Sequence, residues 1–427
     1  MTLEADSPST SERLSATNND HNKLDDNAQP QQRPKEDWFA WLQVLGAFCL
    51  NLNTWGIMNS YGAFQTLYQL NNLNTSSNIS WIGSTQGFLL FFVSVFAGPL
   101  FDAGYLAALL WGGSVLVVVG MFLLSITSEY YQIFLTQAIM MGLGFGCLYL
   151  PAPAVVSQYF DKRTALAMGV SSAGSAIGGV IFPIALTHIK DSIDFGWATR
   201  VLGFILLVTC LIPACVMKSR SPPRTGGALI DYAAFKDVPY LLLCFGLMFG
   251  YMGLYIVFYY IELYTLDQTS ASKGVADYVL VILNIASLPG RVIAGYYADK
   301  IGSVNILALL VLISTIMTAC LLAIGTSAGV IVYCILYGFF SGAFMGLPAA
   351  GVINLTDDKS KIGARLGMTL GVVGVGVLIS NPIAGAILGE ENNWKGLVGW
   401  CCALLVAGTA SMMASRIIKS GAGISKI

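Results

Sequence analysis

One arginine stands inside a long apolar stretch of the chain, between residues 276 and 297. A charged side chain in a bilayer core is costly unless it faces a partner or a water-filled cavity, so Arg291 marks a candidate functional site. Its guanidinium is a fork of donors that matches a carboxylate, and its charge does not titrate. We predict that Arg291 binds an anionic solute, or else forms a structural ion pair with a helix end or with Asp299.

Tyrosines recur at helical spacing in the apolar stretch just upstream. Tyr251, Tyr255, Tyr259 and Glu262 share one helix face, where they could line a cavity that ends in an acid at its outer mouth. Anchoring at a membrane interface explains the tyrosines equally well. Other polar residues within apolar stretches are candidates for a solute-binding lumen or for hydrogen bonds between helices. They are Asn51, Asn53, Asn59, Gln65, Gln137 and Asn284.

Two acids end apolar stretches at related places in the chain. Asp102 and Asp299 are suited to hold the amino terminus of a neighbouring helix through its dipole, so we predict that they form a gate. Lys300, next to Asp299, either belongs to this gate or only flanks the helix and fixes its topology.

Three titratable residues near the predicted outer face are candidates for proton coupling: Glu262, Asp277 and His188. His188 and His21 are the only histidines, and neither stands in a mid-depth cluster of the kind an intramembrane enzyme requires. The nine cysteines include no C-x-x-C pair. We therefore expect no catalytic residue, no metal and no cofactor.

The elements that must position these residues follow from the composition. Charged residues make up 11% of the chain and hydrophobic residues 56%, whereas a soluble domain is about one quarter charged, which indicates a membrane protein. The net charge of -1 leaves no basic patch for a nucleic acid, so none is expected as a partner. Residues 1–37 are polar and predict a disordered tail.

A helix needs about 20 mostly apolar residues to cross a bilayer, and twelve stretches of the chain have that length. The fold class that this predicts is an all-α membrane protein with twelve transmembrane helices. The predicted spans are 38–64, 79–100, 105–126, 131–151, 164–188, 198–217, 240–261, 276–297, 304–324, 329–347, 363–388 and 394–418.

Basic residues predict the orientation, because they are retained in the cytosol during insertion. With the amino terminus inside, cytosolic segments hold 17 basic residues and external segments 4; with Arg291, this accounts for all 22 (17 + 4 + 1). Both termini are therefore predicted to be cytosolic.

An internal repeat divides the chain into two pseudo-symmetric halves of six helices. Residues 98–102 (GPLFD) match residues 295–299 (GYYAD), and residues 150–152 match residues 347–349, both at an offset of 197. The predicted organisation is a cytosolic tail (1–37), a first half (38–217), a cytosolic linker (218–239), a second half (240–418) and a second cytosolic tail (419–427).

The motifs together resemble the monocarboxylate-porter branch of the major facilitator superfamily, in its fungal form. The residues that carry the resemblance are 37–44 (DWFAWLQV), 79–83 (ISWIG), 98–102, 159–163 (YFDKR) and 289–291 (PGR) with 298–302 (ADKIG). Two features depart from the family. Basic residues that relatives carry after the Asp102 position are missing. Ser287 stands where mammalian carriers have an acid one turn before the arginine, so proton coupling is not expected to use that pair.

The resemblance implies a secondary transporter that moves a small organic, carboxylate-bearing solute by alternating access, with proton symport as one expected mode of coupling. We expect it to act as a monomer. The lipid bilayer that holds it is expected to be the plasma membrane. An efflux carrier for a small metabolite and a membrane nutrient sensor without net transport are the alternatives. The substrate, the direction and the coupling ion stay open.

Overall fold

The computed structural model describes residues 37–160, 164–220, 230–356, 358 and 361–421, so most of the predicted tails lies outside the described residues. The helices of the first half are α2 (Trp38–Asn59), α3 (Tyr61–Leu70), α4 (Ser76–Asp102), α5 (Leu106–Leu124), α6 (Tyr130–Ile133), the π-helix η1 (Phe134–Met140), α7 (Met141–Tyr149), α8 (Pro151–Tyr159), α9 (Thr164–Ser192) and α10 (Phe195–Val216).

A short 3-10 helix, η2 (Tyr232–Lys236), precedes the second half. The helices of that half are α11 (Val238–Gln268), α12 (Lys273–Ile301), α13 (Ser303–Leu321), α14 (Ser327–Met345), α15 (Pro348–Leu355), α16 (Ile362–Leu388) and α17 (Trp394–Ser420). Three transmembrane rods are built from successive segments, namely α2 with α3, α6 through α8, and α14 with α15. Counted as rods, these helices make twelve, and the predicted all-α fold is confirmed.

Eleven of the twelve rods are long and apolar enough to span a membrane by length and composition. The rod outside this set is the first, where Gln43, Asn51, Asn53 and Asn59 lower the mean hydropathy of α2. This rod is also interrupted at Ser60, whose hydroxyl donates to the carbonyl of Gly56 at 2.7 Å. The most polar span is therefore also a broken one, as is common where backbone lines a cavity rather than lipid.

Side-chain caps set where several helices begin. The carboxylates of Asp37, Asp194 and Asp237 accept hydrogen bonds from backbone amides in the first turns of α2, α10 and α11. Thr326 and Asn393 cap α14 and α17 in the same way. A cap satisfies an amide that has no partner within the helix, so these polar residues end the loops and start the spans.

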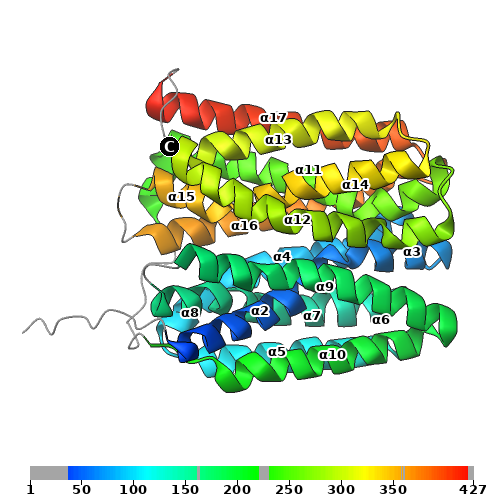
Figure 1. Cartoon of the computed structure of the whole chain (residues 1–427), viewed down its shortest axis with the longest axis horizontal. Helices are drawn as coiled ribbons and strands as arrows, with labels where there is room; N and C mark the ends of the chain where they lie inside the picture. The colour runs from blue at the N-terminus through cyan, green and yellow to red at the C-terminus, as the bar shows by residue number, and fades with distance from the viewer. Residues whose placement is uncertain (1–36, 161–163, 221–229, 357, 359–360, 422–427) are drawn as a thin grey trace, which may run out of the picture.

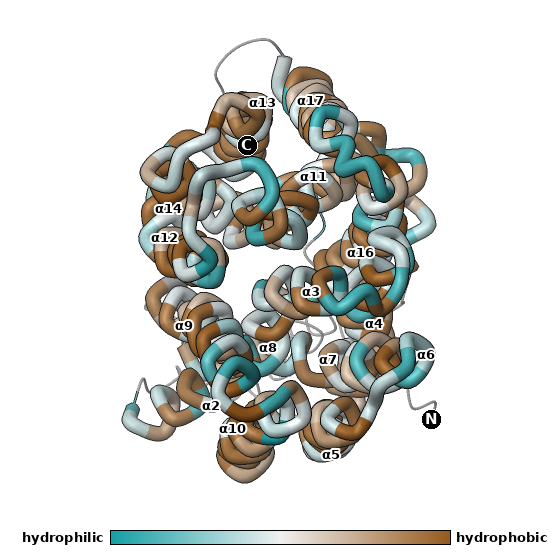
Figure 2. The backbone as a smooth tube through the Cα atoms, turned by 90° about the vertical axis from the view of Figure 1, so that its right-hand side faces the viewer, coloured by the Kyte–Doolittle hydropathy of each residue, from teal (hydrophilic) through white to brown (hydrophobic). Residues whose placement is uncertain are grey.

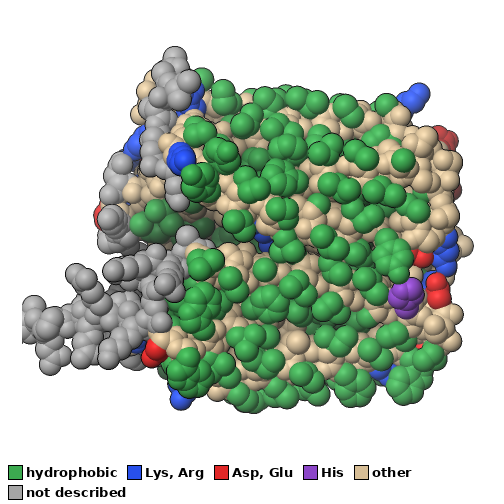
Figure 3. Space-filling model, in the orientation of Figure 1, with side chains coloured by type: hydrophobic (Ala, Val, Ile, Leu, Met, Phe, Trp, Pro, Cys, Tyr) green, Lys and Arg blue, Asp and Glu red, His purple; other side chains and the backbone are tan. Residues whose placement is uncertain are grey.

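The rods run side by side in two bundles, with α2 to α10 in one and α11 to α17 in the other (Figure 1). One end of the molecule carries the ends of α10 and α17 and the start of α11; we call it the linker end, and the opposite end the far end (Figure 1). Seen along the rods, α3, α4 and α9 of the first half face α11, α16 and α12 of the second (Figure 2). On the face seen in Figure 3, hydrophobic side chains are spread over the surface between the two ends, and the coloured charged side chains lie mostly near the ends, as expected for a lipid-facing wall.

Glycines allow close backbone contact within each half. A Cβ atom at Gly174 of α9 would clash with the carbonyl oxygen of Phe48 in α2, and one at Gly290 of α12 with that of Phe339 in α14. Such small-residue contacts let transmembrane helices approach closely without a hydrophobic driving force. Each half is therefore a tightly packed unit.

The two halves are sealed at the far end. Ser77 donates to the carbonyl of Pro382 at 2.9 Å, and the hydroxyls of Ser80 and Tyr260 lie 2.6 Å apart. Three further contacts join the halves at this end, namely the hydrogen bond between His188 and Tyr278, the ion pair between Asp191 and Lys273, and the ring contact between Tyr61 and Tyr259. We call these five contacts the far-end seal.

The halves diverge toward the linker end. The glycines of α16 measure the gap to α4 along the helix. A Cβ atom added to Gly385, near the far end, would lie 2.8 Å from α4, and the distance grows to 3.1 Å at Gly374 and 3.5 Å at Gly367. At Gly363, nearest the linker end, a Cβ atom would meet nothing within 4 Å. Figure 3 shows the surface hollowed between the halves at this same end. The molecule is therefore closed at the far end and open at the linker end, which is one of the two states that alternating access requires.

Candidate functional site

Aromatic rings from both halves meet midway along the rods. The ring of Trp55 in α2 lies 5.6 Å from Phe91 in α4 and 5.4 Å from Tyr149 in α7. Phe91 in turn lies 5.8 Å from Tyr251 in α11, which stacks on Tyr255 at 6.1 Å. We call these five residues the central aromatic cluster. Ring pairs at such distances attract one another and offer flat apolar faces to a bound ring.

Arg291 of α12 lies beside this cluster. Its side chain lies near those of Tyr255 and Tyr251. Its Nη1 atom donates across the interface to Ser175 Oγ at 2.5 Å and to the carbonyl of Ser172 at 3.3 Å. The charge therefore lies between the halves, next to aromatic faces, and its hydrogen bonds among the described residues go to α9.

Several buried polar atoms near this border have no hydrogen-bond partner among the described residues. They include Nε of Arg291, the hydroxyls of Tyr255 and Tyr259, and the side-chain amides of Asn59 and Asn381. Leaving such groups unpaired costs about 1 to 3 kcal/mol each, so they are expected to bind water or a solute. The arrangement can hold a flat molecule against the rings and donate hydrogen bonds to its polar groups.

Three of the predicted lumen residues instead link helices. Asn53 accepts from Thr209 of α10 at 2.6 Å, away from the second half, and Gln137 accepts from Tyr68 of α3 at 2.7 Å. Asn284 donates to the carbonyl of Gly179 at 3.3 Å, and so joins the halves. Of the predicted set, the structure brings Arg291, Tyr255 and Tyr251 together and places Asn53 and Gln137 in helix packing.

Gln137 lies in the π-helix η1, which the sequence analysis did not anticipate. Its backbone carbonyl accepts from Gln86 of α4 at 3.0 Å. A π-helical turn changes the register of the rod, and such turns occur often at functional sites. Here the turn places Gln137 against both α3 and α4, and so joins three rods of the first half.

Glu262 is buried, with 6% of its surface exposed, and lies within α11, which runs to Gln268 and so continues past the predicted end of the span at residue 261. Its place at the outer mouth of a cavity stays a prediction. Apolar and aromatic residues keep the stretch helical until Thr269. Asp277 is half-buried and His188 is exposed, and both lie at the far end with Glu262.

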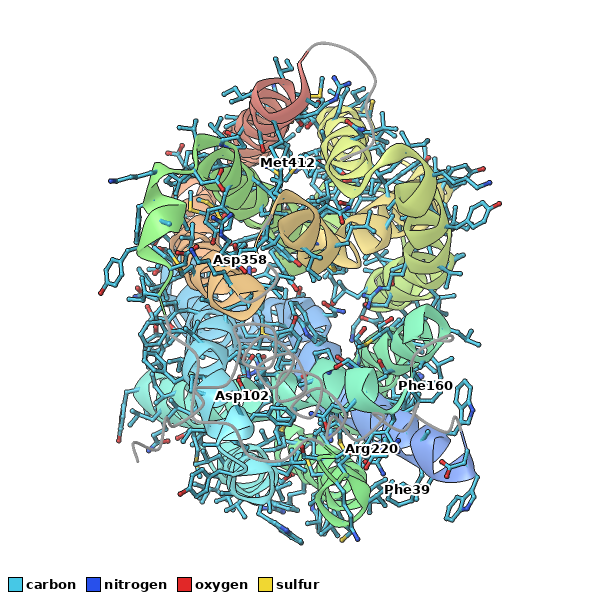
Figure 4. The ribbon with its side chains drawn as sticks, turned by 90° about the vertical axis from the view of Figure 1, so that its left-hand side faces the viewer. Phe39, Asp102, Phe160, Arg220, Asp358 and Met412 are labelled. Atoms are coloured by element: carbon cyan, nitrogen blue, oxygen red, sulfur yellow. The ribbon has the colours of Figure 1, made fainter. Side chains whose placement is uncertain are left out.

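The predicted gate residues lie at the linker end. Asp102 is exposed at the end of α4, and seen from this end it lies on the first half, on the same side of the bundle as Asp358 of the second (Figure 4). Lys300 Nζ donates to the hydroxyl of Tyr296 at 2.6 Å on its own helix. The side chain of Asp299 lies outside the described residues. The gating role of these residues stays a prediction.

Two motifs that carried the family resemblance lie against each other. Trp41 of α2 packs edge-on against Phe160 at 5.3 Å, and Phe39 lies 5.9 Å from Tyr159. Figure 4 shows Phe39 and Phe160 in one corner of the first half together with Arg220, whose guanidinium lies 5.9 Å from the ring of Tyr159. The described residues of these motifs therefore brace the start of the linker.

An ion-pair cluster that the sequence analysis missed holds the segment before α11 to α16. Arg365 donates to Asp231 at 3.1 Å and to Asp237 at 2.7 Å, and Lys361 lies 3.5 Å from Asp231. Burial alone would raise the pKa of the Asp231 carboxyl. The hydrogen bonds from Arg365 and the Ala233 amide and the charge of Lys361 outweigh burial, and together they lower this pKa below its usual value. The cluster ties the beginning of the second half to the helix that faces α4.

Residues 44–356 and 243–421 match the family model described as Major Facilitator Superfamily. An MFS-type transporter of Emericella nidulans, dbaD, is 44% identical over 383 residues, which cover 89% of this chain and 85% of the relative. The aspyridones efflux protein apdF of the same organism is 36% identical, covering 92% and 82%. The fujikurins efflux protein of Gibberella fujikuroi is 34% identical, covering 89% and 83%.

Proposed function

The chain belongs to the major facilitator superfamily, and from this premise we propose that it exports a small organic metabolite by alternating access. The family makes it an integral membrane transporter of a small molecule and not an enzyme. Similarity to relatives named as efflux proteins favours export over uptake of a monocarboxylate. The narrower monocarboxylate-porter resemblance and proton symport stay predictions.

One observation carries the proposal for the substrate. The positive charge of Arg291 lies beside the central aromatic cluster, where residues from both halves meet. A guanidinium binds a carboxylate through parallel hydrogen bonds, and the ring faces bind a flat apolar body. The proposed substrate is therefore an aromatic or otherwise flat organic anion. Neither half alone provides the whole site, as expected for a site at the centre of a rocking carrier.

A binding panel tests this substrate class on purified protein. Thermal stabilisation is measured with 2-naphthoate, with its neutral amide, and with cyclohexanecarboxylate, which keeps the charge but lacks the rings. We expect 2-naphthoate to stabilise the protein most, because it alone combines both features, and a ligand stabilises the state that it binds. Equal thermal stabilisation by the neutral amide would mean that the negative charge is not recognised, and would contradict an anionic substrate. Efflux of the best ligand from preloaded cells, against cells with an empty vector, then tests the direction.

We also propose that the linker end faces the cytosol, as the 17 to 4 distribution of basic residues favours. Reporters fused at Met1, near Arg224 and after Ile427 are expected to report cytosol, and one inserted near Asn74 to report the exterior. An external signal at the Arg224 site would overturn the twelve-helix orientation.

A further inference from the structure

A small pocket lies within the far-end seal. Its volume is about 40 Å³, enough for a few water molecules, and its walls come from α3, α9, α11 and α12. Thr66 and Leu67 contribute the wall from α3, and Leu186 that from α9. Because α3 and α9 belong to one half and α11 and α12 to the other, the pocket exists in this form only while the far end is closed.

Glu262 lines this pocket from α11. Its Oε2 atom is buried and has no hydrogen-bond partner among the described residues. An ionised carboxylate that is buried without partners is strongly disfavoured, whereas the neutral acid can occupy the same place at little cost. The closed far end is therefore compatible with a protonated Glu262.

The charged groups around the pocket do not offset the free-energy cost of an ionised Glu262. Asp277 from α12 repels a negative charge on Glu262, and Lys190 from α9 attracts it. The remaining charges are engaged elsewhere: Lys273 of α12 pairs with Asp191 of α9 at 3.3 Å, and exposed His188 bonds to Tyr278. On α3, the pocket is lined by Ala63, Thr66, Leu67 and Leu70, none of which carries a charge.

We propose that Glu262 is a proton-binding site that gates the far end: it takes up a proton from solution as the two halves close around it, and it loses that proton when they separate. The step is the binding of one proton to a carboxylate oxygen and needs no other reactant. In the orientation proposed above, the proton comes from the exterior. A low external pH would then help the carrier, once it has released its solute, to close its far end and to open toward the cytosol again. The site lies apart from the central aromatic cluster, so the inference does not depend on the substrate.

Hydrogen exchange on the purified full chain tests this proposal without a substrate. Deuterium uptake at the far-end parts of α3 and α9 is measured at a mildly acidic and a mildly alkaline pH and corrected for the intrinsic pH dependence of exchange. One proton bound only in the closed state changes the ratio of open to closed molecules about tenfold per pH unit. We therefore expect more uptake in these segments at the alkaline pH in the wild type.

Glu262→Gln keeps the shape and removes the titration, so its uptake is expected to be low and equal at the two pH values. Glu390→Gln, which neutralises an exposed acid at the same end, is the matched control and is expected to follow the wild type. His188→Gln tests the histidine at the rim and is also expected to follow the wild type. Should Glu262→Gln not fold, Glu262→Leu replaces it.

Two results would overturn the proposal. One is wild-type uptake that does not change with pH; the other is a pH dependence that persists in the Glu262 variant or disappears in His188→Gln. Failure of the export proposal would show instead in the binding panel, which reports on Arg291 and the central aromatic cluster.

Discussion

Replacement of Arg291 by lysine is expected to weaken binding of an aromatic carboxylate by about 1 to 3 kcal/mol, roughly tenfold or more in apparent affinity. Lysine keeps the positive charge but loses the planar fork, including the Nε donor that has no hydrogen-bond partner among the described residues. Apparent affinity for 2-naphthoate, normalised to folded protein, is the measurement. Affinity equal to that of the wild type would remove Arg291 from the binding site.

A control separates solute binding from the contact that Arg291 makes with α9. Ser175→Ala removes the hydroxyl that lies 2.5 Å from Nη1 and leaves the guanidinium in place. If Arg291 binds the solute, Ser175→Ala should change affinity much less than Arg291→Lys. If the arginine only joins the two halves, both variants should have the same effect.

Replacement of Gly62 by valine is expected to abolish transport while leaving the protein folded. A Cβ atom on Gly62 of α3 would clash with the carbonyl oxygen of Phe258 in α11, across the border between the halves. Crowding a packed contact costs about 1 to 3 kcal/mol or more, and at 3 kcal/mol the closed far end becomes about a hundredfold less populated. Because each half keeps its own packing, the carrier should remain trapped with its far end open.

Transport and deuterium uptake at the far end are measured together for this variant. Uptake in α3 and α9 should rise at every pH. Gly112→Val on α5 is the matched control, since a Cβ atom there meets nothing within 4 Å, and it should transport normally. Normal transport by Gly62→Val would contradict the view that this contact must close in each cycle.

The sequence alone predicts the helical architecture because span length and hydropathy are local properties. The same patterns single out Arg291, since a charge in an apolar span stands out without any knowledge of its neighbours. They do not predict Trp55, Phe91 and Tyr149 as its surroundings. Aromatic residues are common in spans, and only the packing of α2, α4 and α7 brings these three together.

Asn53 shows why the role of a polar residue in a span cannot be predicted from the sequence. A polar side chain in a span needs a partner, but the pattern does not say whether that partner is a solute or a neighbouring helix. In the structure it is Thr209. The Arg365 cluster was missed for a related reason, because its acids lie more than 120 residues away in the chain and only the fold places them beside the arginine.

The make-up of the far-end seal has a consequence for the speed of the carrier. The seal rests on a few hydrogen bonds, such as those of Ser77 and His188, and each is worth about 0.5 to 1.5 kcal/mol. Separating them requires only a few kcal/mol, and collective motions of packed helices take microseconds to milliseconds. At one solute per cycle, a carrier that reorients in about a millisecond moves on the order of a thousand molecules each second at most. A cell that needs faster clearance must therefore make more copies of the protein.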